Sequence, residues 1–483
     1  MRAWGLLGIA AAAVGCAPQN DGQIATTSSA VSTDPGAAQI QAYINSAFYA
    51  DTDILYSFLT PESQEVDCID FYAQHSVKGF LEAGLSVSAD NLPSPPALPS
   101  NLPASKPLAT GVSFDVNGHA RKCPEGTVAK SRPTVAQIEA VGGLAAFNSR
   151  RVPHPQQDPN QHDCYWQTTP GPGYDHAVGY QYGTFTGGLT FTPVYAPVVA
   201  FPHYPSYEHS LSELWMQTGS CESWVSLYGG QDTCTDGNAV QSLEVGWMVG
   251  ESFLQGNDDV SPYLFVFITQ DGYSQRNCYA DQSNNGVSCC NTALGYTNSC
   301  WIDAPGIAWP YAVNSNWSSF VQPLGSPPSE ASIQVWNSGS AWNVYIDGHL
   351  IGWYPSVTFT NQMMQSASYM QVGGEVFDSW PCVYGGNCGH TSTGMGSGID
   401  PDYGYGYSAY HRNVNYIDGS GYHDATLSYV VDTPPAELDE GKPGICGYDA
   451  AAFGYDGAGY NLGAGVPGTN WHEYFFFGGY QEP

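Results

Sequence analysis

The sequence predicts a mainly β protein, in which an antiparallel β-sandwich domain follows a small α+β domain. Tyr, Gly and Pro number 33, 56 and 34 among the 483 residues, a composition typical of many strands and turns. Apolar and polar residues alternate in several segments after residue 176, as in strands with one buried face. The net charge of −32 is uneven, because residues 1–151 carry −4 and residues 152–483 carry −28. This shift indicates a domain boundary.

The α+β domain is expected over residues 34–151. Apolar residues at helical spacing predict a helix over residues 34–60. Thr134 and Gln137 have the spacing of a capping box and predict the start of a second helix. Six prolines within residues 90–107 predict an extended surface loop inside this domain.

A second proline-rich stretch, residues 152–175, is the best linker in the chain. It leads into the sandwich domain, which is expected over residues 176–483. Residues 243–249 alternate between apolar side chains and Glu, Gly or Met, the pattern of a strand. Asp347 and Gly348 between two alternating runs predict a tight two-residue hairpin. Many such strands joined by glycine-rich turns favour a sandwich or barrel.

The N-terminus predicts export. Residues 1–16 combine a basic start, a short apolar run and small residues before Cys16, and they resemble a bacterial lipoprotein signal with Cys16 as the lipidated residue. An ordinary signal peptide with an incidental Cys16 is the alternative. Residues 17–33 are polar and small, as in a tether. We therefore expect an extracellular or cell-surface protein that contacts a membrane only through a lipid anchor.

Twelve further cysteines in an exported chain indicate disulfides. Proximity suggests two local pairs, Cys221 with Cys234 and Cys382 with Cys388, and a bond from Cys278 to Cys289, Cys290 or Cys300. Zinc is the competing interpretation, but no C-x-x-C pair occurs and the histidines are scattered. We expect neither a metal nor another cofactor.

Two glutamates, Glu244 and Glu375, lie inside strand-like segments between apolar residues and next to glycines. A carboxylate in a strand either faces solvent or belongs to a site, and nearby glycines allow a substrate to approach. By periodicity alone, a solvent-facing position is the simpler interpretation for each. The sequence lacks the G-x-S-x-G elbow, the H-E-x-x-H motif and phosphate loops, which excludes the commonest hydrolase signatures.

Several segments occur together in the order shared by one known family. The most specific are Gly373-Gly374-Glu375-Val376 and the run HTSTGMGSG from His390 to Gly398. The other segments are residues 67–72, 122–128, 176–180, 210–215, 241–249, 262–279, 351–359 and 471–480. Together they span most of residues 64–483 and resemble the neprosin family of prolyl endopeptidases.

The resemblance implies a fold, an activity and a site. It implies the zymogen of a two-glutamate peptidase that has a β-sandwich catalytic domain and cleaves on the C-terminal side of proline. The catalytic pair of the family maps to Glu244 and Glu375. The segments around Cys68 and Cys123 resemble the two signatures of the family's activation peptide, so these cysteines are expected to pair. Glu213 is a departure, since the family motif usually has glutamine there.

Two facing carboxyl groups can hydrolyse an amide without a metal. The ionised group takes a proton from water, and the protonated group donates to the developing oxyanion and then to the leaving nitrogen. Close carboxyls titrate as a coupled pair, which predicts a bell-shaped pH profile with an acidic optimum. The sequence does not determine which of the two glutamates is the base.

Activation is expected to remove the first domain, which acts as an intramolecular inhibitor. Arg150 and Arg151 could be cleaved by a trypsin-like enzyme, and Pro153, Pro155 and Pro159 by the protein itself. The more basic first domain complements the acidic second domain at neutral pH. Protonation of carboxylates in acid would weaken that attraction.

Two other functions fit the composition. A glycoside hydrolase would also use two carboxyls on a β-sandwich, and a carbohydrate-binding surface lipoprotein would use exposed Tyr and Trp. The activation-peptide segments favour the peptidase, because a binding module needs no inhibitor. We expect a monomer that acts on proline-containing peptides or proteins, and the charge of −32 argues against nucleic-acid binding.

Overall fold

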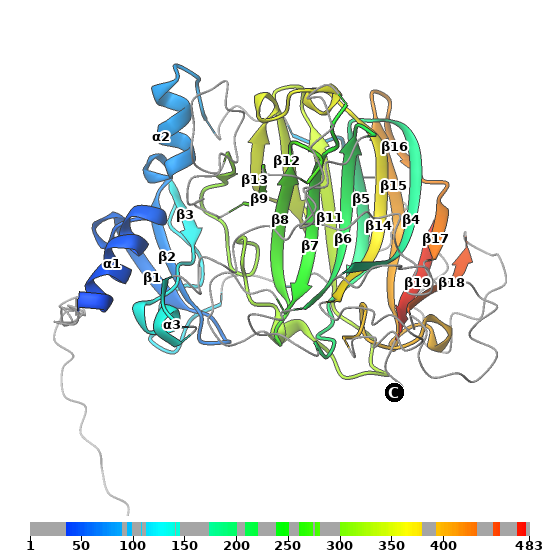
Figure 1. Ribbon diagram of the computed structural model, residues 1–483, viewed down its shortest axis with the longest axis horizontal. Helices are drawn as coiled ribbons and strands as arrows, with labels where there is room; N and C mark the ends of the chain where they lie inside the picture. Colours follow the sequence, from blue (N-terminus) through cyan, green and yellow to red (C-terminus); the bar gives the residue numbers. More distant parts are fainter. Residues whose placement is uncertain are drawn as a thin grey trace, which may run out of the picture.

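The computed structural model describes residues 35–88, 94–98, 108, 113–140, 142–144, 173–199, 208–220, 238–250, 260–273, 276–280, 300–378, 393–431, 448–454 and 471–479. Within these residues two antiparallel sheets stack face to face, which confirms the predicted mainly β sandwich (Figure 1). A smaller sheet with short helices, drawn in blue and cyan, lies beside it. No helix in this part of the chain is long and apolar enough to cross a membrane.

The smaller unit, which we call the front unit, comprises the described residues between 35 and 144. Its sheet has the order β1-β2-β3 in the described chain. Its elements are α1 (Pro35–Ala47), β1 (Ile54–Leu59), β2 (Glu65–Asp70), α2 (His75–Glu82), β3 (Thr127–Lys130) and α3 (Val135–Ala140). Short 3-10 turns lie here at Asp51–Asp53 and Phe71–Ala73, and in the sandwich at Ser318–Phe320, Ser356–Thr358, Gln362–Met364 and Pro401–Tyr403.

One helix prediction in the front unit is wrong and one is confirmed. The helix predicted over residues 34–60 ends at Ala47, because residues 54–59 pair with β2 and bury Phe58 in the core of the unit. The second helix begins as predicted. The Gln137 backbone N–H donates to Thr134 Oγ1 (3.2 Å), and the Thr134 backbone N–H donates to Gln137 Oε1 (2.7 Å).

Disulfides are present in both parts of the molecule. Cys68 on β2 is bonded to Cys123, as expected from the resemblance, and both side chains are buried in the core of the front unit. Cys278 and Cys300 also take part in disulfide bonds. The other cysteines for which pairs are predicted lie outside the described residues: Cys221, Cys234, Cys289, Cys290, Cys382 and Cys388.

The first sheet of the sandwich has the order β10-β13-β12-β11-β5-β15-β19-β18 within the described residues, with β16 paired to β15. The bounds are β5 (Gly187–Pro193), β10 (Ile302–Asp303), β11 (Glu330–Asn337), β12 (Ala341–Ile346), β13 (His349–Pro355), β15 (Ala409–Asp418), β16 (Gly421–Asp424), β18 (Tyr448–Gly454) and β19 (Tyr474–Gly479). The predicted hairpin joins β12 to β13. Asp347 and Gly348 have φ values of 50° and 77°, as a tight two-residue turn requires.

The second sheet has the order β17-β4-β14-β6-β7-β8-β9 within the described residues. The bounds are β4 (Gly173–Phe185), β6 (His209–Thr218), β7 (Gln241–Val249), β8 (Tyr263–Thr269), β9 (Asn277–Tyr279), β14 (Ala367–Asp378) and β17 (Ser428–Val431). β4 begins at Gly173, three residues before the predicted boundary at residue 176, since its backbone pairs with the end of β14.

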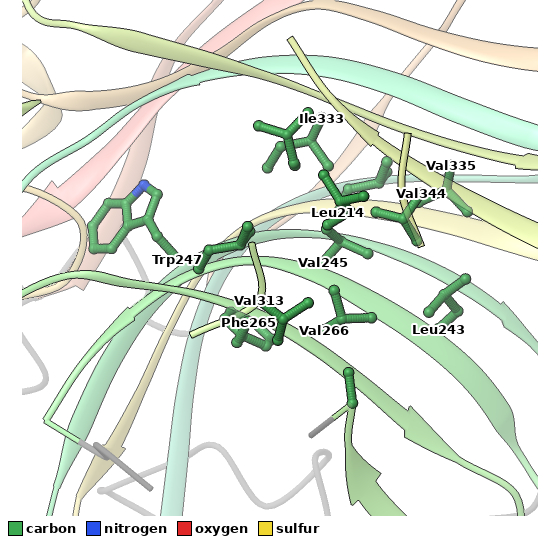
Figure 2. Close-up of a cluster of buried hydrophobic side chains, with 14 of the residues drawn as sticks. Leu214, Leu243, Val245, Trp247, Phe265, Val266, Val313, Ile333, Val335 and Val344 are labelled. Atoms are coloured by element: carbon green, nitrogen blue, oxygen red, sulfur yellow. The ribbon is translucent and has the colours of Figure 1, made fainter. Parts of the chain in front are cut away.

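The hydrophobic core between the sheets determines which way each strand of the second sheet faces. Leu243, Val245 and Trp247 on β7 are fully buried, and Figure 2 shows them gathered with Ile333 and Val335 of the first sheet. Because side chains alternate along a strand, the even-numbered residues of β7 project from the opposite, outer face. The predicted alternation is therefore confirmed, and it directs Glu244 away from the core.

The front unit docks on one edge of the first sheet. The contact includes residues 301–316, with the edge strand β10, and it extends to Asp347, which accepts from the Leu108 backbone N–H, and to Tyr422, whose hydroxyl donates to Pro96 O. The Gly306 backbone N–H donates to Thr127 O (2.7 Å), and Lys130 on β3 forms an ion pair with the buried Asp303. The contact is also apolar, because Trp309 and Ala312 pack in the same buried cluster as Phe58 and the ring of Phe71 stacks on Trp353.

Candidate active site

Three glutamates share the outer face of the second sheet. Glu375 on β14 is directly opposite Leu211 on β6, and Trp215 on β6 is directly opposite Glu244 on β7. Glu213 lies between Leu211 and Trp215 on the same face of β6. Directly opposite residues point the same way, so Glu375, Glu213 and Glu244 form a diagonal row across three neighbouring strands. We call this the carboxyl row.

Glycines flank the middle of the carboxyl row. Glu213 pairs with Gly373 on one side and with Gly246 on the other. A Cβ atom at Gly246 would lie 2.6 Å from the Cβ of Glu213 and 2.0 Å from the backbone oxygen of Ser212. No larger residue therefore fits at Gly246, and Glu213 has no side chain directly opposite it on either neighbouring strand.

The environment of Glu375 favours the ionised form. His176 Nε2 on β4 lies 2.8 Å from Glu375 Oε2, and His209 Nε2 on β6 lies 3.2 Å from Glu375 Oε1. Burial raises the pKa of Glu375. The hydrogen bonds and charge interactions with both imidazoles outweigh this effect and lower its pKa to about 2. The ring of His209 stacks on Phe377, which helps to fix its orientation.

The environment of Glu244 favours the protonated form. The pKa of Glu244 is raised to about 8, mainly by burial and to a smaller extent by the charge of nearby Glu375. Ser242 Oγ (2.5 Å) and the Tyr273 hydroxyl (2.8 Å) both donate to Glu244 Oε1 and oppose this rise. Tyr273 has a φ of 64°, an uncommon conformation for an aromatic residue, and its backbone N–H donates to Thr269 Oγ1.

A buried polar network between the sheets supports the strand in the middle of the carboxyl row. Ser212, next to Glu213 on β6, points inward. Its hydroxyl lies 2.8 Å from Thr192 Oγ1 and 3.2 Å from His411 Nε2. His411 Nδ1 lies 2.9 Å from Thr190 Oγ1, and burial lowers the pKa of His411 to about 3. The uncharged imidazole therefore ties β6 to the first sheet directly beneath the carboxyl row.

The geometry can support general acid–base chemistry. One face carries an ionised carboxylate and a protonated carboxyl, the pair of groups that activates water and donates to an oxyanion. Among the described residues, no group of three or more His, Cys, Asp or Glu side chains is arranged to hold a metal ion.

The structure brings Glu244 and Glu375 to one face, and it adds neighbours that the sequence did not indicate. Ser242 and His209 could have been found from alternation, since each lies an even number of residues from a glutamate of the row on its own strand. Tyr273 lies beyond the end of β8, where alternation gives no signal. The predicted lipidation and processing positions and the motif residue His390 lie outside the described residues: Cys16, Arg150, Arg151, Pro153, Pro155, Pro159 and His390.

Comparisons with known proteins give one family and a weak structural likeness. Residues 311–480 match the neprosin family model, which confirms the resemblance; this range includes Glu375 and begins after Glu244. A kappa-carrageenase from Pseudoalteromonas carrageenovora is 11% identical with a TM-score of 0.19, over 42% of this chain and 57% of that chain. A 1,3-α-1,4-β-D-galactose-4-sulfate-3,6-anhydro-D-galactose 4 galactohydrolase is 8% identical with a TM-score of 0.19, over 42% and 54%. The chain thus spans little more than half the length of either protein.

Proposed function

Because residues 311–480 match the neprosin family model, we propose that the protein is a glutamic endopeptidase. Glu375 is the general base and Glu244 is the general acid. The observation that carries this assignment is the opposite environment of the two carboxyls on one face. Two imidazoles contact Glu375, whereas two neutral hydroxyls contact Glu244.

Hydrolysis begins at Glu375. Its carboxylate takes a proton from water while the water oxygen attacks the peptide carbonyl carbon. Glu244 donates to the carbonyl oxygen as negative charge develops there. When the C–N bond breaks, the leaving nitrogen takes a proton from the dyad. Dissociation of the products and exchange of one proton with solvent restore an ionised Glu375 and a protonated Glu244.

The substrate class is a peptide or protein containing proline, cleaved after that residue. The basis is the resemblance of the G-G-E-V and HTSTGMGSG segments to prolyl endopeptidases. Mass spectrometry of the products from a peptide mixture tests this specificity. Cuts distributed without regard to proline would contradict it and would leave the peptidase assignment intact.

Substitution tests the dyad itself. Glu375→Gln and Glu244→Gln keep the shape of each side chain and remove its ability to transfer a proton. Each is expected to lower kcat/KM on a proline-containing peptide by about 10³-fold. Asp402→Asn, an exposed position on the 3-10 turn at Pro401–Tyr403, is the matched control and should cleave at the wild-type rate. A folded Glu375→Gln or Glu244→Gln protein with near wild-type activity would rule out the dyad.

The front unit is proposed to be an inhibitory prodomain that is removed by cleavage within residues 152–175. Specific docking of the front unit on the sandwich supports this role. Gln64 Nε2 donates to Asn314 O (2.9 Å), and the Asn316 backbone N–H donates to Gln64 Oε1 (3.1 Å). The linker also leads directly into β4, the strand that carries His176 to Glu375. Cleavage there would change the backbone that precedes the base's own hydrogen-bond partner.

Processing is proposed to be autocatalytic in acid. A purified Glu375→Gln precursor should remain one band on a gel when acidified alone, and it should be cut when a small amount of active enzyme is added. Cleavage of the variant at the wild-type rate without added enzyme would show that another mechanism processes the linker.

Export with a lipid anchor on Cys16 is proposed for the precursor. The buried Cys68–Cys123 disulfide supports an oxidising compartment. Labelling with a radioactive fatty acid in a bacterial host should mark the wild-type chain and not Cys16→Ser. Equal labelling of both would exclude Cys16 as the anchor.

A further inference from the structure

We propose that Glu213 is a positioning residue of the carboxyl row, and that its uncharged side chain keeps a second negative charge out of the row that Glu244 and Glu375 share. This inference deepens the proposed function and rests on it. Glu213 is 1% exposed, although it is a carboxylic acid between two other glutamates. A buried carboxyl in such a place must either pair with a cation or remain protonated and neutral.

Among the residues that the structure describes, no cation lies where it would hold Glu213 ionised. Its Oε2 is buried and has no hydrogen-bond partner in the described structure. The nearest directly opposite residues are glycines, so no side chain from β14 or β7 compensates a charge there. The two imidazoles of the site, His176 and His209, are both engaged with Glu375.

Within the described residues, the titratable groups of the site lie on four strands and on the turn after β8. Glu375 lies on β14, Glu244 lies on β7, His176 on β4 and His209 on β6 contact Glu375, and the Tyr273 hydroxyl contacts Glu244. Burial first, and then the charges of Glu244 and Glu375, raise the pKa of Glu213 well above its usual value. At acidic pH the row therefore carries one negative charge, on Glu375.

Ionisation of Glu213 at higher pH would place a second negative charge in the middle of the row. That charge would repel the carboxylate of Glu375 and disfavour any oxyanion that forms beside Glu244. Glu213 thus contributes to the alkaline limit of activity without touching the reacting atoms. Its neutral form is the one compatible with catalysis.

Glu213→Gln tests this role because glutamine has the same shape and cannot ionise. The variant is expected to keep kcat/KM within about threefold of wild type at the acidic optimum and to shift the alkaline limb of the pH profile upward by about 0.5–1 unit. An unchanged pH profile would mean that Glu213 is merely structural. A folded variant that loses more than about 100-fold at the acidic optimum would mean that its carboxyl reacts directly. Either result overturns the proposal.

A readout without substrate separates this proposal from the peptidase assignment. A raised pKa means that the folded state binds more protons than the unfolded state, so stability is highest below the unfolded pKa and falls as pH rises. Glu213→Gln removes one such group. Above about pH 4.5, its Tm should gain on the wild type by roughly 1–1.5 °C per pH unit until Glu213 ionises in the folded wild type. Parallel Tm curves for the two proteins would refute a neutral buried Glu213 even if the protein is not a peptidase.

Discussion

The two ends of the carboxyl row show how one kind of side chain acquires two roles. At the β14 end, Glu375 receives hydrogen bonds from His176 and His209, which can carry positive charge. At the β7 end, Glu244 receives hydrogen bonds from Ser242 and Tyr273, which cannot. Each carboxyl therefore has two donors.

The difference shows that the charge of the donors, more than their number, decides the protonation state. Two hydroxyls do not offset the burial of Glu244, whose pKa is raised to about 8. Two imidazoles more than offset the burial of Glu375, whose pKa is lowered to about 2. A protonated imidazole adds the attraction of a full positive charge to its hydrogen bond, whereas a hydroxyl contributes only its dipole, in agreement with this contrast.

Among the partners of the two glutamates, the largest expected effect comes from removing the two imidazoles that contact Glu375. In His176→Gln/His209→Gln the amides can still donate hydrogen bonds to Glu375 but carry no charge. The pKa of Glu375 should rise, because the interactions that lower it are lost, and the base is ionised only above its pKa. The acid limb of kcat/KM should move upward, with a loss of about 100-fold near about pH 3 and a smaller loss near about pH 6.

His423→Gln is the matched control for this double variant. His423 lies on β16 of the other sheet and pairs with Asp418 at the surface. The pH profile of kcat/KM for the His423→Gln protein should match that of the wild type. If the double variant also keeps the wild-type acid limb, hydrogen bonding alone determines the state of Glu375, and the contrast between the two ends is not one of charge.

An intermediate effect is expected at the other end of the row. Tyr273→Phe removes one donor from Glu244, so its pKa should rise and its proton should persist to higher pH. The alkaline limb should move upward, and kcat should fall by about tenfold because the acid is less well oriented. Tyr345→Phe on β12 of the other sheet is the control and should behave as wild type. A downward shift of the alkaline limb in Tyr273→Phe would reverse the assigned sign.

The sequence predicted the fold class because the physics of strand alternation is local. Residues 243–249 and the Asp347-Gly348 turn predicted strand β7 and the hairpin between β12 and β13. The helix predicted over residues 34–60 was too long, because pairing of β1 with β2 is a contact that helical periodicity cannot reveal. Local patterns thus determine the type of most elements, and distant pairing determines where some of them end.

The site was predictable only in part. Alternation and the family motifs indicated Glu244 and Glu375, but only the register of β6 against both neighbours places Glu213 between them. A shift of one residue would move Glu213 to the inner face. His176 reaches Glu375 through the pairing of β4 with β14, which joins residues 199 positions apart. No pattern within a single segment contains that information.

The smallest expected effect comes from Ser242. Ser242→Ala removes the second donor to Glu244 Oε1, and Tyr273 still orients the carboxyl from the same oxygen. The pKa of Glu244 should rise, the alkaline limb should move slightly upward, and kcat should fall by about threefold. Ser220→Ala, which removes only a surface bond to Asn238, is the matched control.

Combining Ser242→Ala with Tyr273→Phe decides whether the two hydroxyls act as one unit. Because both donate to one oxygen, each can partly substitute for the other, and the double variant should lose more activity than the product of the two single losses. The coupling measured from the four values of kcat should exceed about 0.5 kcal/mol. Independent effects would mean that the hydroxyls hold different parts of the site.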